Sequence, residues 1–308
     1  MTTMSAELPL TTHRQFGKKL NRQRVGYYFV LPALLIYAVF FLYPFLNSVY
    51  LSFTDWNGVG SPVFTGLNNY IRMIQDPVMW RAVSNNLVWI VLGTIAPIAI
   101  GLLIAVLLWS HTRGQLIFRT IYFMPVIMSP VIVGVIWGWI YNPVMGILNK
   151  SLNAVGLEAL ARGWLGEPST ALLAVLAAAV WGYTGFCVAV LFAGLQKIDQ
   201  ELIDASKIDG ANAWERFIYI IIPQLRHILT MISVYTIIGG FNVFDIIFTM
   251  TGGGPANATE VIATYAYKKS FVENEVGYGS ALSTMMTLLA LVATIVFMYV
   301  RESNEERS

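Results

Sequence analysis

Long apolar runs, separated by shorter polar segments, recur along the whole chain. Each run is about 20 residues, long enough to cross a hydrocarbon core of about 30 Å as a helix. The runs are apolar on every face, whereas barrel strands are about ten residues of alternating polarity. The pattern predicts an all-α, polytopic membrane fold with six transmembrane helices. Their expected ranges are Tyr27–Asn47, Leu87–Trp109, Ile121–Tyr141, Leu172–Leu195, Ile228–Phe248 and Ala281–Val300.

Composition and charge agree with this class and predict its orientation. Apolar residues make up 56% of the 308 residues and charged residues only 12%, whereas soluble domains carry about 25% charged residues. Lys and Arg gather on the cytoplasmic side of membrane proteins. With the N-terminus inside, thirteen of the nineteen fall on cytoplasmic segments, and Lys268 and Lys269 form the discordant outer pair. We therefore expect both termini to be cytoplasmic.

The expected organisation is one membrane domain between two short tails. Residues 1–26 form a basic cytosolic tail, residues 27–300 the six-helix domain, and residues 301–308 a second cytosolic tail. Outside, Leu51 to Asn85 is rich in Gly, Pro, Asn and aromatic residues, which predicts a partly helical cap on the membrane surface. The segment "TGGGPANAT", Thr251 to Thr259, predicts a sharp break after the fifth span.

The main cytoplasmic excursion begins with a predicted helix. Asp199 suits the N-cap, and Glu201 in the first turn is favourable against the positive helix terminus. We expect this helix to run to about Ile208. Asp209 and Gly210 then stop it, because Gly readily adopts the left-handed conformation at a helix end.

A second helix is predicted to follow the glycine turn. Asn212 and Glu215 have the spacing of a capping box, so a helix should start there and lead toward the fifth span. One interpretation is a solvated cytoplasmic loop. The other is a docking element for a partner protein, because two capped helices around a defined turn are more structure than a tether needs.

The sequence offers little for catalysis. The three histidines, His13, His111 and His227, have no metal-ligand spacing, so no metal site is expected. The single cysteine, Cys187, lies in the fourth span and is more typical of a small apolar residue than of a nucleophile. No GxxxxGK[ST] phosphate loop occurs, so the chain is not itself an ATPase. We expect a protein that is not an enzyme and binds no cofactor of its own.

An ion-coupled carrier is a weaker alternative. Such carriers hold carboxylates or arginines near mid-membrane, and Asp245 is the only charged residue within the six predicted spans. If the fifth span is a straight helix from Arg226, Asp245 lies about 28 Å along it, near the outer surface.

The cytoplasmic excursion resembles a known family motif. "DASKIDGANAWERFIYIIIP" is similar to the EAA loop in the permease subunits of binding-protein-dependent ABC importers. It departs from the family pattern by Asp for Glu, Ser for Ala and Ile for Leu. The resemblance assigns an ATPase-coupling role within residues 199–223 to Asp204, Ala205, Ser206, Asp209, Gly210, Ala211 and Pro223.

Other segments are similar to the carbohydrate branch of that family, specifically to its maltose-type first permease subunit. These include "RTIYFMPVIMSPVIVGVIWGWIYNPVMGILN" and "FDIIFTMTGGGP" followed by "GYGSAL". The resemblance implies a type I ABC importer permease in a prokaryotic inner, cytoplasmic membrane. It also implies a heterodimer with a second, homologous permease subunit, two cytosolic ABC ATPase subunits that bind ATP and Mg, an external solute-binding protein and a carbohydrate substrate.

The fourth and fifth spans carry the residue types that a sugar path needs. Sugars present apolar faces and hydroxyl rims, which aromatic faces and a few hydrogen-bonding groups can match. The candidates for the substrate path are Tyr183, Phe186, Thr236, Gly240, Asn242 and Asp245. Pro125 and Pro130 can bend the third span beside them. Packing between helices or against membrane lipid is the other interpretation of these residues. Two alternatives for the whole chain are an assembly protein without a pore and an ABC permease for a non-sugar solute such as a glycerol phosphate.

Overall fold

The described part of the first compact unit is a single apolar helix. The computed structural model describes residues 27–110 and 115–305, which belong to two compact units, residues 1–50 and 51–308. The first unit is helical from Tyr27 and includes the π-helical turn η2 (Ala38–Leu42) and α2 (Tyr43–Leu51). Its side chains are almost all apolar, as expected of a helix that spans a membrane. The predicted tail 1–26 lies outside the described residues.

The membrane fold is confirmed, although two of the six spans are broken. Four described helices are long and apolar enough to cross a membrane, and the total is six when each of two bent pairs counts as one span. The long helices of the second unit are α4 (Pro77–Ser110), α8 (Ala171–Leu195) and α15 (Val276–Glu305). Both α4 and α15 begin earlier than predicted. Asp76 accepts from the Val78 and Met79 N–H groups at the start of α4, and Tyr278 in the first turn of α15 donates to the same carboxylate. The orientation of the termini stays a prediction.

The third span is not the straight helix expected over Ile121–Tyr141. It consists of α5 (Gln115–Phe123), the 3-10 turn η3 (Met124–Ile127) and α6 (Pro130–Ile140), and its two halves meet at 108°. The predicted bend at the paired prolines is thereby confirmed. Proline removes a backbone donor and fixes φ, and the Ser129 hydroxyl accepts a hydrogen bond from the Ile132 N–H at the start of α6.

The fifth span also differs from the expectation of one helix over Ile228–Phe248. The segment before it holds α10 (Ala213–Arg216), the π-helical turn η5 (Phe217–Ile221) and α11 (Ile222–Gln224), and it meets α12 (Arg226–Phe241) at 68°. After a break at residues 242–244, α13 (Asp245–Met250) begins. Asp245 therefore does not lie on a straight helix from Arg226. The prediction that placed it near the outer surface assumed such a helix, and that assumption is wrong.

Short elements fill the predicted outer segments. The expected cap contains an antiparallel pair, β1 (Thr54–Asp55) with β2 (Val63–Phe64), followed by α3 (Asn68–Gln75), so its partly helical character is confirmed. The second outer segment, residues 142–170, holds α7 (Ile147–Ala154) and the 3-10 turn η4 (Glu158–Leu160). The third holds α14 (Ile262–Tyr267) and the π-helical turn η6 (Lys268–Val272).

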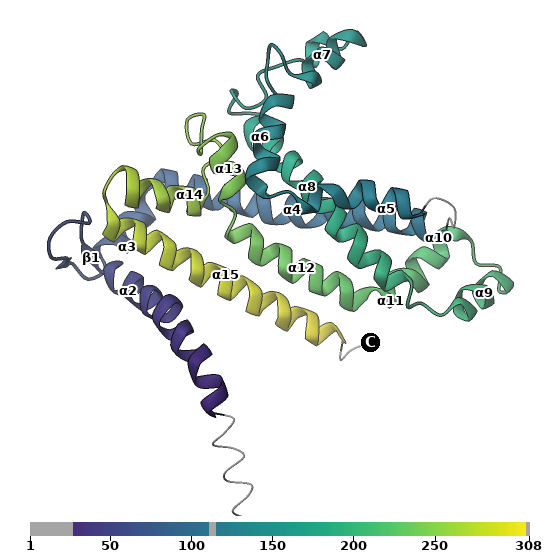
Figure 1. Ribbon diagram of the computed structural model, residues 1–308, viewed down its shortest axis with the longest axis horizontal. Helices are drawn as coiled ribbons and strands as arrows, with labels where there is room; N and C mark the ends of the chain where they lie inside the picture. The colour runs from purple at the N-terminus through teal and green to yellow at the C-terminus, as the bar shows by residue number, and fades with distance from the viewer. Residues whose placement is uncertain (1–26, 111–114, 306–308) are drawn as a thin grey trace, which may run out of the picture. The chain divides into compact units, whose positions relative to one another are not determined.

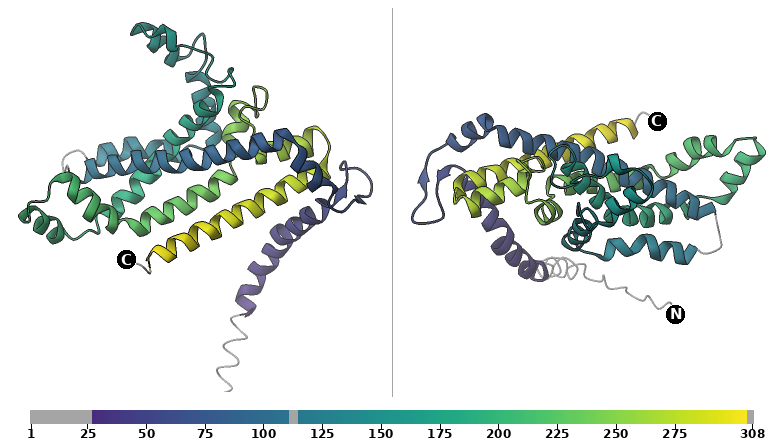
Figure 2. Two further views of the ribbon diagram at one scale, coloured as in Figure 1. Left: turned by 180° about the vertical axis from the view of Figure 1, so that it is seen from behind. Right: turned by 90° about the horizontal axis from the view of Figure 1, so that it is seen from above.

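Close packing of α4 on α8 forms the centre of the second unit. A Cβ atom on Gly101 would lie 2.7 Å from the Cys187 Cβ, so glycine is needed for this approach. Helix α12 packs against α4, and α15 packs against α12 and α14 (Figure 1). Within this unit α9 (Gln200–Ile208) and α10 lie at one end, and β1 and α3 lie at the other (Figure 2).

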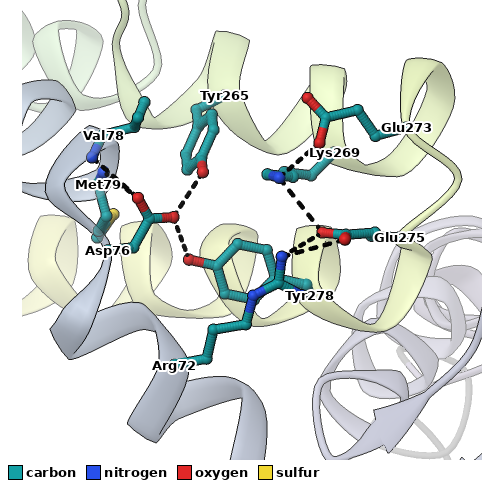
Figure 3. Close-up of polar contacts among 9 residues, drawn as sticks. All are labelled: Arg72, Asp76, Val78, Met79, Tyr265, Lys269, Glu273, Glu275 and Tyr278. Atoms are coloured by element: carbon teal, nitrogen blue, oxygen red, sulfur yellow. Dashed lines mark hydrogen bonds and ion pairs between the residues drawn. The ribbon is translucent and has the colours of Figure 1, made fainter.

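Charged and tyrosine side chains join the outer elements, and we call this group the outer clasp. It consists of Arg72, Asp76, Tyr265, Lys269, Glu275 and Tyr278. The Tyr265 and Tyr278 hydroxyls both donate to the same Asp76 oxygen, and Arg72 pairs with Glu275 at 2.8 Å (Figure 3). Lys269 pairs with Glu273 and Glu275, which explains how a lysine is accommodated on the side that the charge rule disfavours.

Candidate functional site

The two broken spans border one cavity of about 610 Å³. The break at Pro125 and Pro130 forms one part of its wall, and the break between α12 and α13 forms another. Helices α4 and α8 complete it. Non-helical backbone is tolerated at membrane depth where it lines a cavity, and broken helices are a common feature of transporter binding sites. The cavity is therefore the candidate site for solute.

Aromatic rings cover much of the wall. Tyr183 stacks on Tyr235 with ring centroids 6.2 Å apart and an angle of 8° between the planes. Phe186 contacts both, at 5.2 Å from Tyr183 and 5.8 Å from Tyr235. Phe244 and Trp89 also line the cavity. Together these rings give a broad apolar surface that fits the flat faces of a sugar ring.

Polar groups on the same wall are few. The Tyr183 hydroxyl is buried and has no hydrogen-bond partner among the described residues. The Thr236 hydroxyl already donates to carbonyls of its own helix, and the Asn242 amide donates to the Ile238 carbonyl, which leaves its oxygen facing no described donor. Asp245 contributes the only charged side chain among the described lining residues.

All six residues predicted for the substrate path lie on this one cavity. Sequence reasoning identified Tyr183, Phe186, Thr236, Gly240, Asn242 and Asp245, and the structure brings them together from α8, α12, the break and α13. It missed Trp89, Tyr235 and Phe244. Tyr235 lies seven residues before the candidate Asn242 on the predicted fifth span, so helical spacing could have found it. Trp89 comes from α4, and no local pattern indicates that contact.

Two adjacent asparagines join the cavity wall to the outer segment 251–261. The Asn86 side chain, 1% exposed, donates to the Gly240 carbonyl at 2.9 Å and accepts from the Ile262 N–H at 2.9 Å. Asn85 donates to the carbonyls of Ala258 and Glu260 at 3.0 and 2.7 Å. One buried amide thus links α4, α12 and α14.

Glu260 stabilises the same outer segment from within. Its side chain is 1% exposed and accepts a hydrogen bond from the Thr264 hydroxyl at 2.6 Å. Burial raises the pKa of Glu260, although the Thr264 hydrogen bond acts in the opposite direction. A Cβ on Gly253 would collide with this carboxylate, so the glycine-rich run is needed for the fold of the segment.

Residues 199–223, the predicted coupling segment, have the local structure expected from their sequence. Asp199 caps α9 by accepting from the Glu201 N–H at 2.9 Å, and the helix ends at Ile208. Gly210 has φ of +82°, the left-handed conformation that ends helices. The capping box of Asn212 and Glu215 is present.

The segment presents some of its predicted coupling residues and buries others. Asp204, Ala205, Asp209, Gly210 and Pro223 are exposed, Ala211 is half-buried, and Ser206 is buried. The Lys207 ammonium lies 2.8 Å from the Asp204 carboxylate. Its hydrogen bond to that carboxylate lowers the pKa of Asp204. Ile203 anchors α9 by packing in the same core cluster as Ile221 and Leu225.

Sequence reasoning missed the exposed apolar side chains of this segment. Ile208 is 87% exposed and Trp214 is 67% exposed, on either side of the glycine turn. Large apolar side chains in an otherwise charged segment would have been a usable signal, because exposed apolar groups that cluster mark interaction surfaces.

Comparison with known proteins decides the family. A family model described as "Binding-protein-dependent transport system inner membrane component" matches residues 97–307. The chain belongs to this family. The family expected from residues 204–223 is thus confirmed, and the protein is an ABC transporter permease and a multi-pass protein of the cell membrane.

Relatives cover nearly the whole permease. It is 35% identical over 280 residues to a probable ABC transporter permease of Pyrococcus horikoshii, with 91% of this chain and 96% of that protein covered. It is 34% identical over 287 residues to the trehalose/maltose transport system permease protein MalF of Thermococcus litoralis, with coverages of 92% and 95%.

A solved structure supports the fold of the permease. The crystal structure of a bacterial ABC transporter that imports the acidic polysaccharide alginate superposes with a TM-score of 0.82 and 20% identity, and 94% of this chain and 99% of that chain are covered. At this identity the likeness establishes the architecture of an ABC importer permease.

Proposed function

We propose that this permease is one half of the translocation path of an ATP-driven, binding-protein-dependent sugar importer. The observation that carries the proposal is the match to the family together with relatives such as the trehalose/maltose permease. The partners are a second permease, two cytosolic ATPase subunits and an external solute-binding protein. ATP and Mg bind to the ATPase subunits, and this chain binds no cofactor.

The solute path runs along the cavity. Its aromatic wall of Tyr183, Phe186 and Tyr235 offers flat apolar contact, and the Tyr183 hydroxyl and the Asn242 oxygen offer hydrogen bonds. A small number of polar groups suits transport, because a site that conducts solute must bind it weakly enough for release. Sugar selectivity is then set largely by the external binding protein.

Coupling runs through residues 199–223. The exposed face of α9 and the side chains of Ile208 and Trp214 dock on the ATPase. Ile203 and the turn into α12 pass the movement of α9 to a helix that lines the cavity. A segment joined to the cavity wall by packed helices can transmit domain closure without a flexible linker.

Uptake by the complete importer in proteoliposomes tests this function. We expect labelled sugar to accumulate when ATP is inside and binding protein outside, and not with a proton or sodium gradient alone. Accumulation driven by the ion gradient would favour the ion-coupled carrier. Accumulation that is unchanged when this chain is omitted would favour an assembly role, and accumulation of a glycerol phosphate in place of sugar would favour the non-sugar permease.

A further inference from the structure

The charge of the cavity wall is unbalanced. Among the described residues that line it, Asp245 is the only one with a charged side chain, and none is Lys, Arg or His. The Asp245 side chain is exposed to the cavity, and no ion pair to it is present within residues 27–110 and 115–305. The described wall therefore carries one carboxylate and no cation.

We propose that Asp245 makes the path selective for neutral saccharides and excludes anionic solutes such as uronates and sugar phosphates. This inference rests on the proposed function and adds the substrate class to it. The wall around Asp245 is largely apolar, with Val243, Phe244 and Ile246 beside it in the chain. Like charges repel more strongly across such surroundings than in bulk water, so an anion that enters has repulsion to overcome and no cation to pair with.

The remaining polar groups on the wall suit hydroxyl groups. The unpartnered Tyr183 hydroxyl can donate to or accept from a sugar hydroxyl, and the free Asn242 oxygen and the Asp245 carboxylate can only accept. Several sugar hydroxyls together can satisfy all three groups, because each hydroxyl both donates and accepts. A carboxylate is only an acceptor at neutral pH, so a carboxylate that faces Asn242 or Asp245 leaves those acceptors without a donor.

A cysteine probe in the cavity measures this charge without depending on the binding protein. Gly239 lines the cavity, and a Cβ added there meets no atom within 4 Å. The native Cys187 is fully buried, which leaves Gly239→Cys as the accessible thiol. The reagents are the cationic trimethylammonioethyl methanethiosulfonate and the anionic sulfonatoethyl methanethiosulfonate, applied to the complete importer. Ser61→Cys, in the exposed turn between β1 and β2, gives the reference ratio of the two rates.

We expect the ratio of cationic to anionic modification rates at Gly239→Cys to exceed the Ser61→Cys ratio by about tenfold. Adding Asp245→Asn should bring it to within about twofold of the reference, and Asp245→Glu should keep it high. A Gly239→Cys ratio equal to the reference, or one that Asp245→Asn leaves unchanged, would overturn the inference. Modification rates do not require transport, so a failure of sugar uptake would count against the proposed function alone.

Discussion

At the scale of a single residue, the Tyr183 hydroxyl allows contact with solute to be tested separately from the stability of the fold. Its hydroxyl has no partner among the described residues, so Tyr183→Phe removes no hydrogen bond from the protein. We expect the variant to unfold at the parent's temperature but to transport sugar roughly fivefold more slowly, which corresponds to one hydrogen bond of about 1 kcal/mol. Uptake and thermal unfolding of the purified importer measure both effects.

Tyr141 provides the matched control for this change. Its hydroxyl donates to the Ala174 carbonyl at 3.1 Å, and it does not line the cavity. Tyr141→Phe should therefore lower the unfolding temperature and leave the uptake rate of the folded protein unchanged. Parent-like uptake by Tyr183→Phe would show that its hydroxyl does not contact solute.

Asp76 gives the outer clasp a dependence on pH. Burial opposes ionisation of Asp76, but hydrogen bonds from Tyr265, Tyr278 and the Val78 N–H outweigh it and hold the pKa below its usual 3.8. A lowered pKa in the folded state stabilises the fold above the unfolded pKa, and this contribution is lost as the pH falls through the folded value.

We expect Asp76→Asn to lower the stability of the importer by about 1–2 kcal/mol at pH 7, because the amide has one acceptor oxygen and cannot accept from both the tyrosine hydroxyls and the Val78 N–H. The difference in unfolding temperature from the parent should shrink as the pH is lowered below about 4. A difference that stays constant from pH 7 to pH 3 would show that ionisation of Asp76 does not contribute.

The coupling segment depends at the element scale on one backbone conformation. Gly210 has φ of +82°, and a Cβ there would meet no atom within 4 Å, so a substitution is opposed by strain and not by collision. For a β-branched residue this strain is about 1–3 kcal/mol. We predict that Gly210→Val inserts normally, but that liganded binding protein no longer stimulates ATP hydrolysis.

Gly210→Asn is the informative control, because asparagine tolerates positive φ better than other non-glycine residues. Gly210→Asn should retain most of the stimulation of ATP hydrolysis. A substitution of Asn153 on α7, outside residues 199–223, should retain all of it. If Gly210→Val hydrolyses ATP and transports like the parent, the segment is a passive tether.

The junction of α4, α12 and α14 depends on the Asn86 amide. Asn86→Asp keeps an acceptor for the Ile262 N–H but removes the donor to the Gly240 carbonyl. Leaving that buried carbonyl unpaired costs about 1–3 kcal/mol. We expect a lower unfolding temperature and faster protease cleavage within residues 251–261. The control is Asn69→Asp: Asn69 donates to the Ser52 and Thr54 carbonyls in the outer cap, so this change should lower the unfolding temperature without speeding that cleavage. Parent-like cleavage would show that the bridge is not needed.

At the scale of the whole molecule, the sequence predicts what depends on local pattern. Hydrophobic runs located the four long spans and the two bent pairs, and capping residues such as Asp199 and Asn212 predicted α9 and α10 closely. The sequence did not predict the places where the direction of the chain depends on residues that are distant in the sequence. Residues 242–244 are as apolar as their neighbours apart from Asn242, so nothing local indicates that α12 ends there and α13 begins beside α6.

The candidate site shows the same division. Its six predicted residues share one cavity because they come from two adjacent spans, where residue type was informative. Trp89 was missed because its place on the wall depends on how α4 packs against α8 and α12. The outer clasp was missed for the same reason, since Asp76 and Tyr278 are distant in sequence.

The central claim is that ATP-driven sugar uptake runs through the cavity, and blocking the cavity tests this claim most directly. In vesicles that hold the complete importer, a bulky neutral maleimide is attached to Gly239→Cys on the cavity wall, or to Ser61→Cys outside it. ATP-driven sugar uptake is then compared with that of the unmodified protein. We predict that modification of Gly239→Cys removes nearly all uptake and that modification of Ser61→Cys removes none. Undiminished ATP-driven uptake through fully modified Gly239→Cys would contradict a solute path along this cavity.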